Sequence, residues 1–132
     1  MVELRHDASE LQKLIGLTVD LEESDSQIFV IIRSFPLPAG AYAVQRSDVL
    51  IITDQQYRLS ALDMFYVEPD VLLPGGAVPL NADSIEIHAG RQWRRFSWHR
   101  NGVWNPSRNG LVDHFAFIEA RLTHDGPVEN GR

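Results

Sequence analysis

The stretch "QIFVIIRSFPLPAGAYAVQRSDVLIIT", residues 27–53, decides the fold. Its first part, 27–35, is a run of β-branched and aromatic residues, which predicts a strand buried on both faces or nearly so. A second run of this kind at 47–53 predicts the next strand. Between the two, "PLPAG" at 36–40 interrupts the pattern, because proline cannot donate to a β-ladder and glycine permits a turn.

Two further strands are predicted, one on each side of this pair. Residues 17–23, "LTVDLEE", alternate apolar and polar side chains, which is typical of a half-buried strand. "SDS" at 24–26 predicts the turn that follows it. Further along, Met64 to Val67 predicts a short strand, which Pro69 stops. The connections are short, so we expect an antiparallel four-stranded meander.

A helix is predicted at each end of the meander. Residues 9–15 have apolar side chains on one helical face, with Ser9 as the N-cap and Gly16 as the C-terminal cap. Residues 111–122 repeat Leu111, Phe115, Ile118 and Leu122 at helical spacing. Strands segregated from helices indicate an α+β fold. We expect a single domain over 1–122 and a flexible polar tail over 123–132.

Composition excludes several classes of protein and of site. The 132 residues suffice for one domain, and they contain no cysteine, which excludes disulfides, thiolate metal sites and a cysteine nucleophile. No apolar run approaches the roughly 18 residues of a membrane span, and no secretory signal is evident. We therefore expect a soluble cytoplasmic protein. The five histidines form no metal-ligand spacing and no nucleotide motif is present, so we predict neither metal nor cofactor.

Arginine and tryptophan are concentrated in one stretch, "GRQWRRFSWHRNGVW", residues 90–104. It holds all 3 tryptophans, and no acidic residue lies between Glu86 and Asp113, although the net charge of the chain is −6. Two interpretations stay open here. The stretch is an interface, since both residue types favour one. Alternatively Trp93, Phe96 and Val103 belong to the core, other indoles cover the sheet edges, and arginine stems pack against them.

The order of elements resembles the ubiquitin-conjugating enzyme fold. The chain is similar to one bacterial branch of that superfamily, the prokaryotic ubiquitin-conjugating-like family E. The resemblance rests on "PLPAGAY" (36–42), "SDVLII" (47–52), "DMFYVEP" (63–69), "RQWRRFSWH" (91–99) and "VWNP" (103–106). It implies an N-terminal helix, the four-stranded meander, an irregular active-site-like segment and a C-terminal helix. It also implies membership of a bacterial ubiquitin-like modification system.

The chain departs from this family pattern at the catalytic position. A conjugating enzyme carries its cargo as a thioester on a cysteine somewhat before the tryptophan of the W-x-P motif, here Trp104. Counting back about eight residues reaches Phe96 and Ser97, and no cysteine is present there or elsewhere. Ser97 with His99 as base is the one catalytic pair that the segment offers, for acyl transfer or hydrolysis. A serine, histidine and Asp113 trio is the weaker form of the same idea.

The favoured interpretation is a non-catalytic scaffold, although the sequence leaves open whether the chain is an enzyme. We expect it to bind a ubiquitin-like protein, its activating enzyme, or both. The predicted binding residues are the arginines and tryptophans of the segment: Arg91, Trp93, Arg94, Arg95, Trp98, Arg100 and Trp104. A nucleic-acid-binding module using the same residues is the third hypothesis, which the acidic net charge disfavours.

Overall fold

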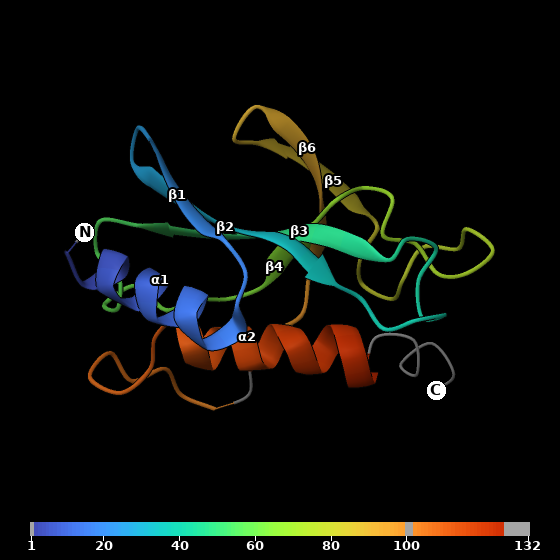
Figure 1. The fold of residues 1–132 in the computed structure, drawn as a ribbon. Helices are drawn as coiled ribbons and strands as arrows, with labels where there is room; N and C mark the ends of the chain where they lie inside the picture. Colours follow the sequence, from blue (N-terminus) through green and yellow to red (C-terminus); the bar gives the residue numbers. More distant parts are fainter. Residues whose placement is uncertain (1, 100–101, 126–132) are drawn as a thin grey trace.

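The computed structural model describes residues 2–99 and 102–125 (Figure 1). Its elements follow the chain in the order helix, six strands, helix. They are α1 (Val2–Ile15), β1 (Val19–Ser24), β2 (Gln27–Pro36), β3 (Arg46–Asp54), β4 (Phe65–Val67), β5 (Ser84–His88), β6 (Arg91–Phe96), α2 (Leu111–Ala120) and a π-helical turn, η1 (Arg121–Asp125).

The predicted α+β class is confirmed, and the sheet has two more strands than predicted. All strands belong to one antiparallel sheet of order β1-β2-β3-β4-β6-β5. The first four are the expected meander. The expectation of an irregular segment after β4 is wrong in part, because residues 84–96 form the β5–β6 hairpin. Ala89 and Gly90 close that hairpin with φ values of 52° and 74°, the left-handed geometry of a tight two-residue turn.

Both helices cover the same face of the sheet (Figure 1). Every apolar residue predicted to face inward from the second helix is buried there: Leu111, Phe115, Ile118 and Leu122. The first helix begins at Val2 rather than at Ser9. Leu4 and Leu11, two turns apart, are fully buried and extend its apolar face toward the N-terminus. Gly16 ends this helix as predicted, with φ 72° and a bond from its amide to the Gln12 carbonyl, 2.9 Å.

A β-bulge divides β2 into two parts. Ile32 pairs with Val49 and Phe35 pairs with Ser47, so Arg33 and Ser34 together lie opposite Asp48. Ser34 has φ 53°, and its amide donates to Asp48 Oδ1 at 2.8 Å. The extra residue brings Phe35 to the helix side of the sheet, where its ring meets that of Phe115 edge-on at 5.7 Å.

The other face of the sheet carries a second, smaller core. Five buried side chains form it: Phe29, Ile31, Leu50, Tyr66 and Trp93. No helix covers this face in the described part of the chain (Figure 1). Ion pairs between long side chains close over it instead, as the site below shows.

Two expectations concern the C-terminal tail and membrane-spanning helices. The predicted tail begins inside η1 at residue 123, and residues 126–132 lie outside the described residues. Among the described helices, none is long and apolar enough to cross a membrane.

Candidate interaction site

The first half of the arginine and tryptophan segment is strand β6, and Trp93 is its centre. The Trp93 side chain is fully buried in the second core, and its Nε1 donates to the His88 carbonyl across the hairpin at 2.9 Å. The Arg91 guanidinium lies over the Trp93 ring, 4.2 Å from the centroid. Arg91 also pairs with Asp48 on β3 at 2.9 Å. Trp93 thus offers no surface to a partner.

Arg94 points to the opposite face of the sheet and is also buried. Its Nε donates to the Pro69 carbonyl at 2.9 Å and its Nη1 to the Ala82 carbonyl at 2.7 Å. Only 9% of the residue is exposed. The guanidinium therefore joins both ends of the loop between β4 and β5 to the sheet, and supplies donors for carbonyls that would otherwise be buried without one.

Arg95 belongs to a polar network on the open face. Its Nη1 pairs with Glu86 Oε2 on β5 at 2.8 Å, and Glu86 also accepts from Tyr66 (3.2 Å) and contacts His88 Nε2 (2.8 Å). The His88 hydrogen bond, followed by the nearby Arg95 charge, holds the pKa of Glu86 below its ordinary value of 4.5. Burial and the adjacent Glu86 raise the pKa of Tyr66 to about 12. This network covers one side of the second core.

Asp48 is the common hydrogen-bond acceptor for the side chains that cover the other side of the second core. It accepts from the Ser34 amide and from the guanidinium groups of Arg33 (3.3 Å) and Arg91 (2.9 Å). Burial by itself would raise the pKa of Asp48. These hydrogen bonds outweigh it and lower the pKa below the ordinary value of 3.8. The acid-free segment therefore takes its counter-charges from β3 and β5, its neighbours in space.

The second half of the segment is described at residues 97–99 and 102–104, which lie outside the strands and are exposed or half-buried. Trp98 is half-buried, with its Nε1 donating to the Leu80 carbonyl at 3.2 Å and the Arg121 guanidinium 3.8 Å above its ring. Trp104 donates to the Arg58 carbonyl at 2.7 Å. Val103 is 93% exposed, so the expectation that it belongs to the core is wrong. Arg100 lies outside the described residues.

The predicted catalytic pair is not assembled in this structure. The Ser97 hydroxyl oxygen accepts from Arg95 Nε at 2.8 Å, whereas His99 Nδ1 contacts Asp63 Oδ2 at 2.6 Å. Strand β6 ends at Phe96, so Ser97 and His99 lie beyond it and do not share a strand face. Within the described residues no hydrogen bond joins them. Asp113 is also elsewhere: its carboxylate accepts from the Gly110 amide at 2.9 Å, at the start of α2.

A buried polar cluster beneath Trp104 was not predicted. Asp7 on α1 accepts from the Tyr57 hydroxyl (2.7 Å) and from Arg58 Nε and Nη2 (2.9 and 3.0 Å), and Tyr57 accepts from the Leu111 amide (2.8 Å). Burial and the Asp7 carboxylate raise the pKa of Tyr57 above its ordinary value. A β-carbon at Gly110 would approach Asp7 Oδ2 to 2.9 Å, so this position excludes a side chain. The helix expected from the sequence begins at Ser9, so Asp7 lies outside it and no sequence signal pointed to this cluster.

Comparison with known proteins gives one finding. Residues 4–125 match the family model of prokaryotic E2 family E, a range that covers all six strands and α2. No curated protein and no solved structure matches the chain. The resemblance drawn from the sequence motifs is thereby confirmed. The chain belongs to prokaryotic E2 family E and is an E2-like, or ubiquitin-conjugating-like, domain of a prokaryotic ubiquitin-like system.

Proposed function

We propose that this chain is a non-catalytic member of its family that binds a ubiquitin-like protein or its activating enzyme. The observation that carries the proposal is the absence of cysteine from all 132 residues. The thioester by which a conjugating enzyme holds its cargo needs a cysteine sulfur. Without it the fold retains its surfaces but has no group that forms the thioester.

The surroundings of Ser97 support the same proposal. A serine hydroxyl is a weak nucleophile at neutral pH unless a positioned base removes its proton. The side chain bonded to Ser97 Oγ is Arg95, which stays protonated and cannot act as that base. His99 is directed to Asp63 instead. An oxyester at Ser97 would require the Arg95 contact to break and the His99 ring to come within hydrogen-bond reach of Ser97.

We place the contact with the partner on the second half of the segment, at residues 97–99 and 102–104. Val103 is 93% exposed and the His99 side chain 72% exposed, and the half-buried Trp98 lies between the Leu80 carbonyl and Arg121. A partly exposed indole fixed by two neighbours is a suitable anchor, because little side-chain entropy remains to be lost on binding. Arg91, Trp93, Arg94 and Arg95 are assigned a supporting role, since each is held by internal contacts.

A quantitative binding assay with matched variants tests the proposal. A ubiquitin-like protein and an activating enzyme of a prokaryotic ubiquitin-like system are titrated against the wild-type chain, with and without ATP. We expect reversible binding that does not depend on ATP and leaves no adduct by mass spectrometry. Val103→Glu should weaken it at least tenfold. Val2→Glu is the matched control, since Val2 is 82% exposed at the start of α1 and outside the proposed contact.

Two results would overturn the proposal. Equal affinities of the wild type and Val103→Glu would remove the contact from residues 97–104. An ATP-dependent mass increase that maps to Ser97 and disappears in Ser97→Ala would make the segment an active site. The Asp63–His99 contact at 2.6 Å favours this catalytic alternative, because an orienting carboxylate is one part of a hydrolytic arrangement.

The nucleic-acid alternative is tested in the same assay with a single-stranded oligonucleotide. Arg91, Arg94 and Arg95 already pair with carboxylates or carbonyls, so they offer few donors to phosphates. We expect no saturable binding at 150 mM salt. Tight binding that falls steeply as salt rises would contradict this expectation.

A further inference from the structure

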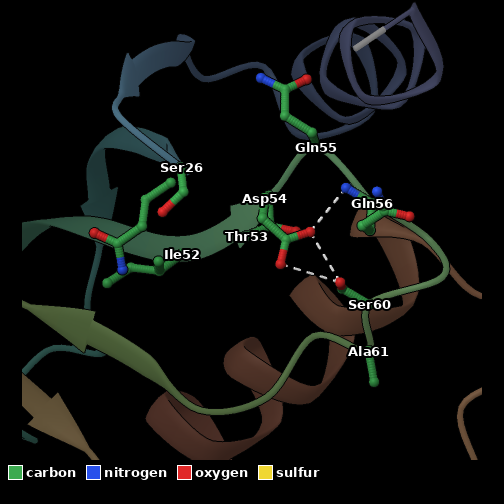
Figure 2. Close-up of a pocket in the computed structure, with 9 residues that line it drawn as sticks. Ser26, Ile52, Thr53, Asp54, Gln55, Gln56, Ser60 and Ala61 are labelled. Atoms are coloured by element: carbon green, nitrogen blue, oxygen red, sulfur yellow. Dashed lines mark hydrogen bonds between the residues drawn. The ribbon is translucent and has the colours of Figure 1, made fainter.

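A polar pocket lies at the C-terminal end of β3, the opposite end of that strand from Asp48 and its partner Arg91. Figure 2 shows its lining, which comes from the β1–β2 turn, the ends of β2 and β3, and the loop after β3. The lining residues are Ser26, Gln27, Ile52, Thr53, Asp54, Gln55, Gln56, Ser60 and Ala61. Its volume of about 460 Å³ is near the low end of the range for ligand pockets, about 300–1,000 Å³. That is sufficient for one large side chain.

Asp54 is the only charged residue of the lining. Its carboxylate accepts from the Gln56 amide at 2.8 Å and from the Ser60 hydroxyl at 2.8 and 3.1 Å, and these bonds fix its orientation (Figure 2). No cation pairs with it among the described side chains. Arg58, the basic residue of the same loop, is directed to Asp7 instead. The pocket thus holds a fixed negative charge without a counter-charge.

We propose that this pocket binds the side chain of an arginine presented by a partner protein. The guanidinium carries a positive charge for Asp54 and five donors for the surrounding oxygens of Gln27, Gln55 and Ser26. Ile52 and Ala61 provide an apolar wall for the aliphatic stem. Glu23 lies beside the lining, where its carboxylate accepts from Gln55 Nε2 at 3.3 Å, and places a second carboxylate near the pocket. The lining shares no residue with the contact proposed above, so the proposal does not rest on that function.

An NMR titration with small probes tests the assignment. N-acetyl-arginine-methylamide represents a side chain within a protein, and the citrulline analogue is its uncharged counterpart. We expect saturable shifts of the amide resonances of Asp54, Gln55 and Ser60 with the arginine probe and none with citrulline. The apparent affinity should fall at least tenfold in Asp54→Asn. Asparagine keeps the oxygen that accepts from Gln56, so the loop should remain folded.

Two controls separate the possible outcomes. Asp70→Asn removes an equal charge from an exposed position outside the pocket and should leave the titration unchanged. Free arginine should bind no more tightly than the capped probe. Tenfold tighter binding of free arginine would assign the pocket to a small amino acid and overturn the protein side chain as its ligand. Three results would overturn the site itself. They are equal binding of the citrulline analogue, an affinity for the arginine probe that is unchanged in Asp54→Asn, and no saturation at 50 mM probe.

Discussion

The two halves of the arginine and tryptophan segment have similar compositions and different positions in the fold. Residues 91–96 form a strand between β4 and β5, where Trp93 is fully buried and Arg94 is 9% exposed. Residues 97–99 and 102–104 lie outside the strands, and Val103 is 93% exposed. The side chains of the first half make contacts within the protein, whereas the second half presents side chains to solvent. A local excess of arginine and tryptophan therefore says little about binding until its neighbours in space are known.

The largest expected effect is at the buried end of this comparison. Trp93→Ala removes a fully buried indole and its bond to the His88 carbonyl, so the free energy of unfolding should fall by about 3–5 kcal/mol. Val103→Ala, in the exposed half, should change it by less than about 0.5 kcal/mol. Urea denaturation of both variants measures the two values. Similar losses in the two variants would break the distinction between the halves.

Arg94→Met should come next in magnitude. Methionine fills much of the arginine volume but leaves the Pro69 and Ala82 carbonyls without their donor, at a cost of about 1–3 kcal/mol. Hydrogen exchange should show faster opening of the loop at residues 69–82 than in the wild type. Arg108→Met, at an exposed position outside the sheet, is the control. An unchanged exchange rate in the loop would show that Arg94 does not hold it.

The network on the open face should give stability a dependence on pH. The folded-state pKa of Glu86 is below its ordinary value of 4.5, because His88 and Arg95 favour the charged form. Its contribution is therefore fully present above pH 4.5 and is lost as the pH falls through the lower folded-state value. We expect Glu86→Gln to flatten the fall in unfolding free energy over that window. Parallel wild-type and variant curves between pH 5 and pH 3 would contradict this assignment.

The smallest expected effect lies in the exposed half. Removing the Arg121 side chain in Arg121→Ala should cost about 0.5–1 kcal/mol, the usual value for a cation–π contact of limited burial. Tryptophan fluorescence should report a more mobile Trp98. His99→Ala should cost less than 1 kcal/mol, because its contact with Asp63 is between exposed groups. Losses above 2 kcal/mol in either variant would mean that this half is also structural.

The parts of the fold that the sequence predicts well are those decided by local pattern. The runs at 27–35 and 47–53 became β2 and β3, and the apolar repeat from Leu111 became α2. The β5–β6 hairpin was missed, because "SIEIH" is short and follows a loop rich in proline and glycine. Its two isoleucines alternate as a strand requires, yet Ile87 is 72% exposed, so burial gave no supporting signal.

The candidate site was predicted less well, for a physical reason. Arg91 finds Asp48, and Arg95 finds Glu86, only after strands distant in the sequence become neighbours in the sheet. Sequence inspection could note that residues 87–112 lack acids, but not that β3 and β5 would supply them. The same limit applies to His99, whose partner Asp63 is 36 residues away.

The extra residue at Ser34 reverses the alternation of side chains along β2, so that different residue numbers face the helices before and after it. Before it, even-numbered residues such as Ile32 face the helices, and after it the odd-numbered Phe35 does. Deleting one residue there would move every following side chain of β2 to the other face of the sheet. Phe35 would then no longer contact Phe115. Substitution at the same place is far gentler, because Ser34→Gly keeps the count and suits the positive φ. At this position the number of residues matters more to the fold than which residue is present.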